Sequence, residues 1–272
     1  MKNKIFTMIL VLVMCLTVVS CSSKPAATPE PAGGTETETE SDFSYVQDKG
    51  NLVIGYTVYE PMNYTDGDGV FTGFDTELAM LVCEKLGLAP NFVEIDWNTK
   101  EIELAARSID CIWNGLTIND ERKQNMEVTT PYIKNAQVVI MKSDAQYDGT
   151  ASLADKTVCA EAGSAGEDAI LDDDNLKNAT FVSKEVQTAC LMEVAAGTVD
   201  AAVLDLTLAK AMIGEGTNYA DLVIKDRLAV EDYGVAFRKG SDICERVNAI
   251  FADFVTDGTM KDLADKYGLD LS

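Results

Sequence analysis

The 272-residue chain has no histidine. This absence excludes Ser-His-Asp and Cys-His catalysis, and it removes the most common metal ligand in proteins. The seven cysteines contain no C-x-x-C pair, the usual spacing of zinc and dithiol motifs. We therefore expect neither a metal site nor a cofactor.

Basic residues are scarce as well. The chain has 22 lysines and arginines against 45 aspartates and glutamates, a formal net charge of −23. A body this acidic argues against nucleic acid as a partner and against binding to anionic lipid headgroups. The charge does not by itself identify a partner, because a charged surface is usually just a solvated one.

Long hydrophobic runs are absent except at the start, where residues 5–19 follow Lys2 and Lys4. This run is short for a membrane span and has the length of a signal peptide's hydrophobic region. It ends in Val-Val-Ser-Cys, which resembles the lipobox of bacterial lipoproteins. The resemblance implies that residues 1–20 are a signal peptide and that Cys21 is lipidated. A cleaved signal peptide with a chance cysteine is the alternative.

Residues 22–42 contain three prolines, few large apolar side chains and no periodic pattern. Such a segment cannot bury enough surface to order itself. We therefore interpret residues 21–42 as a lipid anchor and a disordered tether. This interpretation places the folded protein outside the cytoplasm, anchored to the cell membrane.

About 230 residues remain from Phe43, more than a single domain usually has, which suggests two lobes. Strand and helix patterns alternate along them, which predicts an α/β fold with a parallel sheet covered by helices on both faces. Strands are expected at residues 52–54, 91–95, 109–113, 157–160, 181–182 and 201–204. Helices are expected from an Asp75 N-cap to Gly87, at 102–106, from Asn119, from about Ala165, along 186–194, and as a helix–turn–helix over 247–267.

An internal similarity links the two halves of this stretch. Residues 103–110 (ELAARSID) and 193–200 (EVAAGTVD) lie 90 residues apart, and both fit a helix end, a turn and an entering strand. If the halves are built alike, Gly115 and Asp205 stand at the carboxyl ends of equivalent strands, where open α/β sheets bind ligands. The similarity therefore predicts one cleft between two lobes, with chance resemblance of two βα units as the alternative.

Two charged residues are candidates for that cleft. Arg122 stands near the start of a predicted helix, where a cation opposes the helix dipole at a cost of up to about 1 kcal/mol. Its planar fork matches a carboxylate, although a surface arginine paired with Glu121 or Glu127 is the alternative. Asp205 ends the apolar strand 201–204 and can accept an ammonium group or, alternatively, serve as an N-cap.

Two weaker signals accompany them. Tyr59, in a loop after the first strand, is either a cover for an apolar ligand face or a partly buried aromatic. Gly163 and Ser164 precede a helix whose free backbone N–H groups suit an anion.

Five cysteines of the folded part lie in apolar stretches, and we expect them to be buried as small hydrophobic residues. A single disulfide is left open, because spacing cannot assign a pair. The five are Cys83, Cys111, Cys159, Cys190 and Cys244.

Five short segments together resemble one protein family. They are Gly-Phe-Asp-Thr-Glu-Leu at 73–78, Gly-Leu-Thr-Ile-Asn-Asp-Glu-Arg at 115–122, Pro-Tyr at 131–132, Gly-Ser-Ala at 163–165 and Asp-Gly-Thr at 257–259. In this order and spacing they resemble the polar amino acid-binding proteins of ABC transporters, solute-binding protein family 3. The family has the type II periplasmic binding protein fold, two Rossmann-like lobes joined by a two-strand hinge.

The resemblance implies roles for individual residues. Arg122 would bind the ligand's α-carboxylate with the Thr117 hydroxyl and the Ser164 backbone N–H, while Asp205 and the Gly115 carbonyl would bind the α-ammonium. The full set of implied ligand-binding residues is Tyr59, Trp113, Asn114, Gly115, Thr117, Arg122, Gly163, Ser164, Ala165 and Asp205.

The resemblance also implies a domain plan. Residues 43–136 plus 236–272 would form lobe 1 and residues 137–235 lobe 2. The lobes would close on the ligand about a hinge near residues 135–139 and 233–237.

The function implied is capture of a free amino acid outside the cell and delivery to an ABC permease and its ATPase, by a monomer that is not an enzyme. Thr57 stands where some binders of cationic amino acids carry an acid, which favours a neutral polar or small ligand, with cystine as another choice. One alternative is an enzyme on the same fold, a dehydratase or lytic transglycosylase with Glu161 as general acid. The other is an amino acid-sensing receptor domain.

Overall fold

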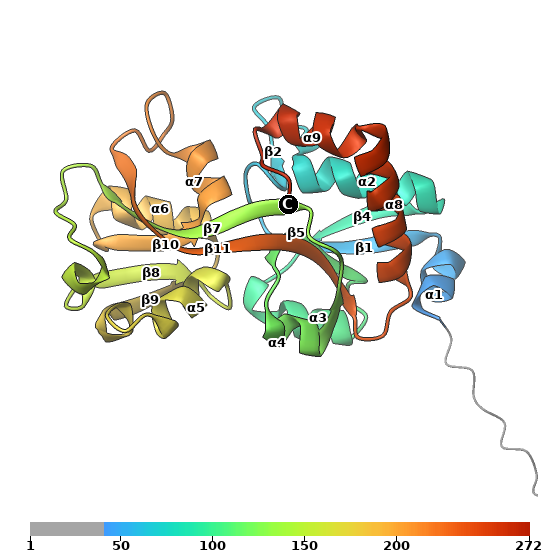
Figure 1. The fold of residues 1–272 in the computed structure, drawn as a ribbon, viewed down its shortest axis with the longest axis horizontal. Helices are drawn as coiled ribbons and strands as arrows, with labels where there is room; N and C mark the ends of the chain where they lie inside the picture. Colours follow the sequence, from blue (N-terminus) through green and yellow to red (C-terminus); the bar gives the residue numbers. More distant parts are fainter. Residues whose placement is uncertain (1–40) are drawn as a thin grey trace, which may run out of the picture. The chain divides into compact units, whose positions relative to one another are not determined.

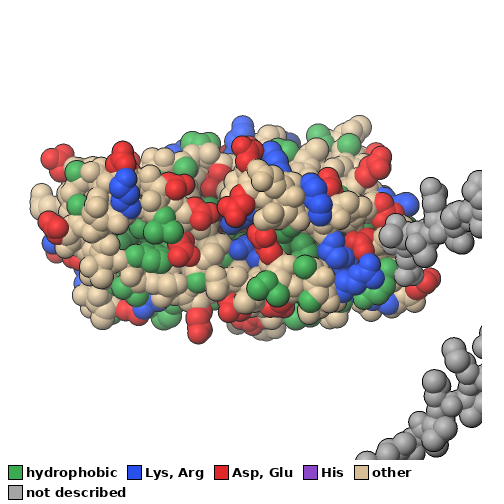
Figure 2. Space-filling view, turned by 90° about the horizontal axis from the view of Figure 1, so that it is seen from below, with side chains coloured by type: hydrophobic (Ala, Val, Ile, Leu, Met, Phe, Trp, Pro, Cys, Tyr) green, Lys and Arg blue, Asp and Glu red, His purple; other side chains and the backbone are tan. Residues whose placement is uncertain are grey.

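The computed structural model describes residues 41–272 (Figure 1). The predicted signal peptide, Cys21 and residues 22–40 of the tether lie outside the described residues. The tether prediction is wrong at its end, because Ser41 is the N-cap of a helix that begins at Asp42. Within the described part, no helix combines the length and the apolar character needed to cross a membrane. Acidic side chains are spread over the whole face shown in Figure 2 rather than gathered in one patch.

Helices and strands alternate as the sequence predicts. The α-helices of the described residues are α1 (Asp42–Lys49), α2 (Phe74–Leu86), α3 (Lys100–Ala105), α4 (Asp120–Asn125), α5 (Ala165–Asp172), α6 (Gln187–Ala196), α7 (Leu206–Met212), α8 (Ile243–Asp257) and α9 (Thr259–Tyr267). The strands are β1 (Asn51–Tyr56), β2 (Tyr64–Thr65), β3 (Phe71–Thr72), β4 (Ala89–Glu94), β5 (Cys111–Thr117), β6 (Met126–Val128), β7 (Ile133–Lys142), β8 (Thr157–Glu161), β9 (Thr180–Lys184), β10 (Ala201–Asp205) and β11 (Leu222–Arg238).

One sheet runs through the described residues in the order β4-β1-β5-β11-β7-β10-β8-β9, with β6 also paired to β11. We call β4, β1, β5 and β6 its first half and β10, β8 and β9 its second half, with β7 and β11 shared between them. Helices cover both faces of each half (Figure 1): α2, α8 and α9 lie opposite α3 and α4, and α6 and α7 lie opposite α5. The predicted α/β fold is therefore confirmed.

The prediction of a parallel sheet is wrong at the centre of the sheet. The outer pairs β1–β4, β1–β5, β10–β8 and β8–β9 are parallel, but β7 and β11 pair antiparallel with each other and with their neighbours. The reason is the path of the chain, which crosses to the second half along β7 and returns along β11. The two strands pair from Leu222↔Lys142 to Tyr233↔Ile133.

The predicted N-cap of α2 is also wrong. The helix begins at Phe74 after Gly73, which makes no side-chain cap, and Asp75 lies inside the first turn. The Asp75 carboxylate is fully buried and instead accepts hydrogen bonds from the Gly115 N–H, at 2.6 Å, and the Tyr132 hydroxyl, at 2.8 Å. It therefore attaches the helix to β5, close to the predicted cleft.

The internal similarity of the sequence is present in the backbone. The Ser108 N–H donates to the Glu103 carbonyl at 3.0 Å, and the Thr198 N–H donates to the Glu193 carbonyl at 3.1 Å. Each turn uses the left-handed conformation one residue earlier, with φ of 61° at Arg107 and 75° at Gly197. The two halves of the sheet thus contain equivalent βα units.

The aspartates that end these two segments differ in burial. Asp110 is fully buried, accepts from the Val53 N–H at 2.8 Å, and pairs with Lys49 and with Arg238, the latter at 3.3 Å. Asp200 accepts from the Thr157 N–H at 2.9 Å, but its side chain is 44% exposed and its ion pair with Lys156 is 4.0 Å long. The same hydrogen bond is therefore combined with a buried ion pair in the first half only.

The five cysteines of the described residues are all free and buried, which confirms their expected role as small hydrophobic residues. No group of three or more histidine, cysteine, aspartate or glutamate side chains suited to a metal ion occurs in residues 41–272.

Replacing Asp110 with Asn should lower the free energy of unfolding by about 3 kcal/mol, because two cations would lose their buried partner. The equivalent change Asp200→Asn should cost less than about 1 kcal/mol, since exposed ion pairs contribute little. Urea unfolding of the two variants measures the difference. Equal losses would show that the buried ion pair does not stabilise the first half.

Candidate ligand-binding site

A cavity of about 10 Å³ lies where the two halves of the sheet meet. That is roughly the room one water molecule needs. The side chains around it are mostly buried and polar. They are Trp97, Asn114, Gly115, Thr117, Arg122, Glu161, Ser164, Ala165, Gln187 and Asp205.

The lining residues gather here because strands end here. Asn114 to Thr117 form the carboxyl end of β5, Glu161 ends β8 and Asp205 ends β10. Open α/β sheets collect ligand-binding groups at this edge, as the internal similarity of the sequence predicted.

Arg122 reaches the cavity from the first turn of α4. Its backbone N–H donates to the Asn119 side chain at 2.8 Å, the helix N-cap, and its guanidinium donates to the Thr117 carbonyl at 2.7 Å. The residue is only 4% exposed, yet no carboxylate of residues 41–272 lies within 4.0 Å of it. Burial lowers the pKa of the guanidinium. The alternative of a surface arginine paired with Glu121 or Glu127 is therefore wrong.

Asp205 faces Arg122's half of the sheet from the end of β10. It occupies the N-cap position of α7 but makes no capping bond, so its carboxylate is available to the cavity. One oxygen accepts from the Asn135 and Gln137 amides, the latter at 2.8 Å, and the other accepts from the Gln187 amide. Burial raises the pKa of the carboxyl, while these hydrogen bonds oppose the rise.

A second pair of ionisable groups lies beside them. Glu161 is 3% exposed, its Oε1 has no hydrogen-bond partner in the described residues, and burial raises its pKa to about 8. Lys100, on α3, is 5% exposed and donates to the Trp97 carbonyl at 3.1 Å and to the Gly163 carbonyl at 2.8 Å. Burial lowers the Lys100 pKa to about 8.

Asn114 and Gly115 form the floor on the first half. The Asn114 amide accepts from Thr57 and donates to the Asn63 side chain at 2.7 Å, so its orientation is fixed. Gly115 has φ of 57°, and a Cβ there would stand 2.8 Å from the Tyr59 ring. No other residue type fits at this position without moving the tyrosine.

The structure brings together seven of the ten residues expected at the ligand. Asn114, Gly115, Thr117, Arg122, Ser164, Ala165 and Asp205 all line the cavity.

The other three lie nearby but not on the cavity wall. The Tyr59 hydroxyl hydrogen-bonds the hydroxyls of Thr207 and Tyr233, so the ring covers Gly115 from behind. Trp113 is fully buried against Phe251, because neighbouring residues on a strand face opposite sides. Gly163 contributes its backbone turn, with φ of 66°.

Several groups at the site were not identified from the sequence. Trp97 and Gln187 line the cavity, and Asn135, Gln137 and Glu231 surround Asp205. Asn135 and Gln137 had a usable signal, because they are two polar residues on one side of the apolar strand β7. Trp97 and Gln187 stand in segments without a comparable pattern.

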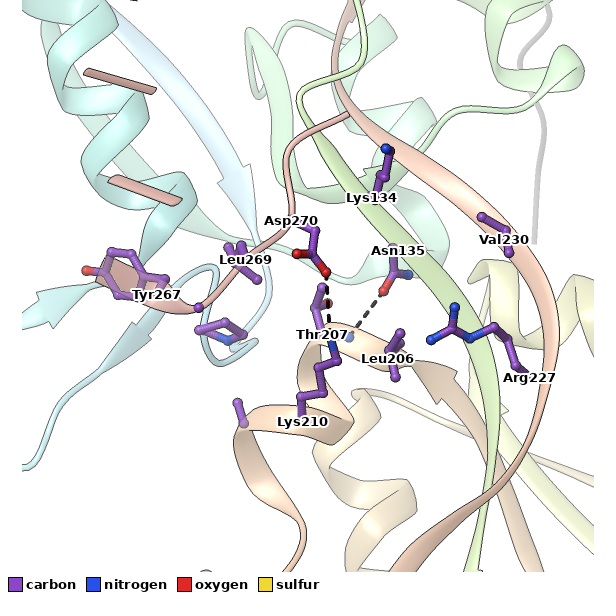
Figure 3. A pocket seen from close by; sticks show the side chains of 13 residues that line it. Lys134, Asn135, Leu206, Thr207, Lys210, Arg227, Val230, Tyr267, Leu269 and Asp270 are labelled. Carbon is purple, nitrogen blue, oxygen red and sulfur yellow. Dashed lines mark hydrogen bonds and ion pairs between the residues drawn. The ribbon is translucent and has the colours of Figure 1, made fainter. Parts of the chain in front are cut away.

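A larger groove, about 340 Å³, is lined by Asn135, Leu206 and Thr207 among others (Figure 3). Lys210 and Arg227 extend into it, and Asp270 pairs with Lys210 at 3.7 Å. Its charged side chains are exposed, and it contains no buried pair of opposite charges. The smaller cavity is therefore the better candidate for specific recognition of a small polar molecule.

The smaller cavity can accommodate opposite charges at defined places. Arg122 and Asp205 are both buried without an ion-pair partner among residues 41–272. A ligand carboxylate would supply that partner for Arg122, and a ligand ammonium group would supply it for Asp205. Such a site recognises a zwitterion by requiring both groups at once.

Known proteins with similar sequences and structures bind amino acids. The chain is 28% identical to the L-cystine-binding protein TcyJ of Escherichia coli (strain K12) over 241 residues, 86% of this chain and 88% of the relative. The structure resembles that of Tv2483 bound to L-arginine, with 29% identity, a TM-score of 0.79 and coverage of 85% and 96% of the two chains. It also resembles an ancestral amino acid-binding protein, a precursor of cyclohexadienyl dehydratase, with 28% identity, a TM-score of 0.75 and coverage of 84% and 99%.

These comparisons confirm the resemblance inferred from the five short segments. The family model of bacterial extracellular solute-binding proteins, family 3, matches residues 52–270. The match covers well over half of the chain, from within β1 through the site to beyond the end of α9, so the chain belongs to this family.

Proposed function

We propose that this protein captures a free amino acid in the cavity between its two halves and delivers it to an ABC importer. The proposal rests on one observation above all: Arg122 and Asp205 are both buried at one cavity, and neither has an ion-pair partner among the described residues. A ligand with an α-carboxylate and an α-ammonium supplies both missing charges. The amino acids bound by the relatives support the same class of ligand.

Two lobes would open and close to admit the ligand, with residues 43–136 plus 236–272 in lobe 1 and 137–235 in lobe 2. The cavity of about 10 Å³ supports this motion, because no amino acid fits without separation of its walls. Within residues 41–272, only β7 and β11 carry the sheet from one half to the other, which supports a hinge near residues 135–139 and 233–237.

Contacts across the cavity would hold the closed form. The Lys100 ammonium donates to the Gly163 carbonyl at 2.8 Å, and the Tyr59 hydroxyl bonds to Thr207. Tyr59 would thus act as a closing contact and as support for Gly115, in addition to its expected place near the ligand side chain.

A neutral polar or small amino acid fits the charge of the site best. Burial raises the pKa of Glu161 to about 8 and that of Glu231 to about 7, so much of their negative charge is absent at neutral pH. Thr57 stays engaged with Asn114 and brings no acid. Cystine remains a second choice, because its polar second half could donate to Glu161.

Isothermal titration of residues 43–272 against the twenty amino acids and cystine tests the proposal directly. At least one should bind, and Arg122→Ala should weaken that binding by at least about 100-fold, because truncating one partner of a buried charge pair costs 2–5 kcal/mol or more. Lys123→Ala, an exposed neighbour on α4, should leave the affinity unchanged. Failure of every amino acid to bind would remove the proposal.

The buried carboxyl of Glu161 should make the free energy of unfolding decrease as pH rises. Its carboxyl keeps its proton up to about pH 8 in the folded protein, whereas the unfolded chain loses it near 4.5, so folding is favoured by protonation in this window. Between pH 5 and 8, Glu161→Gln should become more stable relative to wild type by about 1 kcal/mol per pH unit. Urea unfolding at several pH values measures this, with the exposed Glu84→Gln as control. A difference that does not change with pH would contradict the buried, protonated state.

A buried carboxylic acid also supports the second candidate function, an enzyme with Glu161 as general acid. The resemblance to a precursor of a dehydratase points the same way. Product formation that disappears in Glu161→Gln would favour the enzyme, and binding without turnover would favour transport.

We further propose that the protein works as a monomer held at the outer side of the membrane by a lipid on Cys21. This location is supported by the sequence around Cys21 and by the family, which consists of bacterial extracellular solute-binding proteins.

Expression of the full chain in a bacterium that processes lipoproteins tests the anchor. The wild type should sediment with membranes and incorporate labelled fatty acid, while Cys21→Ala should do neither, because the acceptor thiol is gone. Cys244→Ala, a change at a buried cysteine, is the matched control. A membrane-bound, lipid-labelled Cys21→Ala protein would refute this assignment.

A further inference from the structure

Two carboxylates of the site share the same hydrogen-bond donors. The Asn135 amide donates to Asp205 and, at 2.6 Å, to Glu231. The Gln137 amide donates to the same oxygen of Asp205 and the same oxygen of Glu231, at 2.8 Å each. Two oxygens held by the same two nitrogen atoms must lie close to each other.

No cation offsets this pair. Neither Asp205 nor Glu231 has a lysine or arginine within 4.0 Å among residues 41–272. Asp205 is 6% exposed, and the Glu231 oxygen that faces it also accepts from the Thr117 hydroxyl at 3.0 Å. Two like charges in contact in a buried site cannot both ionise easily, so one proton is retained.

We propose that the Asp205–Glu231 pair holds one proton in the free protein and releases it to solvent when the α-ammonium of the ligand binds. The inference rests on the proposed function and adds a residue, Glu231, and a proton to it. The ammonium supplies the positive charge that the proton supplied before. Glu231 acts as a positioning residue, because it orients Thr117, Asn135 and Gln137 rather than contacting the ammonium itself.

The groups that face the pair from other elements are consistent with this exchange. Arg122 on α4 interacts electrostatically with both carboxylates, and Lys100 on α3 acts on Glu161. Glu161 on β8 keeps its proton up to about pH 8, because burial raises its pKa, and so adds little negative charge below that pH, while the charge of Asp168 on α5 acts on Arg122. The buried hydroxyls of Tyr59 and Tyr233 stay neutral, since burial holds their pKa values well above the usual range.

The titration of Glu231 falls in a useful range. Burial, followed by the charge of Asp205, raises the Glu231 pKa to about 7. Below this value the pair carries its proton in the free protein, and an ammonium ion at Asp205 favours the ionised form. Ligand affinity should therefore rise with pH up to about 7 and change little above it.

Titration calorimetry of the wild-type protein in buffers of different ionisation enthalpy counts the protons released. The probe is the amino acid that binds most tightly in the panel described above. Close to one proton should be released at pH 6 and almost none at pH 8, with an affinity about tenfold higher at pH 8. Binding at pH 6 without proton release would overturn the inference while leaving amino acid capture intact.

Two variants assign the proton. Glu231→Gln should still bind the probe but should release no proton at pH 6 and show no rise of affinity with pH. Glu161→Gln, at the other buried carboxyl of the cavity, should still release its proton at pH 6. Loss of release in Glu161→Gln instead, or its persistence in Glu231→Gln, would overturn the assignment to Glu231. If Glu231→Gln does not fold, the proton count of the wild type still decides whether a proton is exchanged.

If no amino acid binds the wild-type chain at any pH, the proposed function itself fails, and the proton exchange fails with it. That result is distinct from binding without proton release.

Discussion

The rest of this structure depends on one constraint, the burial of charged side chains that touch no side chain of opposite charge in the described part of the chain. Moving an ion out of water costs several kcal/mol even after the protein relaxes around it. Arg122 offsets part of this cost through the Thr117 carbonyl, and Asp205 does so through three side-chain amides. These hydrogen bonds orient the charges but do not neutralise them, so a zwitterion gains more here than it would in water.

The central strands link that site to the geometry of the fold. Asn135 and Gln137 lie two residues apart on β7, so both amides project to the same side and reach Asp205 together. Glu231 pairs with Asn135 across the β7–β11 ladder. Because these strands also carry the chain between the two halves, any rotation about them shifts the donors that hold Asp205.

The sequence predicted the parts of the site whose signals are local. Arg122 could be recognised because a cation at the start of a helix opposes the helix dipole. Asp205 could be recognised because it ends an apolar strand. Asp75 was misassigned for the opposite reason, since local rules make it a cap while the folded chain uses it to hold the Gly115 N–H, 40 residues away. Glu231 was missed because its importance comes from contacts with Thr117 and Gln137, which no spacing in the sequence reveals.

The internal similarity bears on which way round a ligand would lie in the site. Gly115, near the end of β5, and Asp205, at the end of β10, hold matching positions in the two similar segments, yet one has no side chain and the other carries the buried carboxylate. In the first half, the rings of Tyr59 and Tyr233 stand where a side chain of residue 115 would have to go. In the second half, the Asp205 carboxylate instead accepts hydrogen bonds from the Asn135, Gln137 and Gln187 amides. The two equivalent units therefore differ at one position. Under the proposed function this difference sets the orientation of the ligand, whose ammonium would lie towards Asp205 and whose carboxylate would lie towards Arg122.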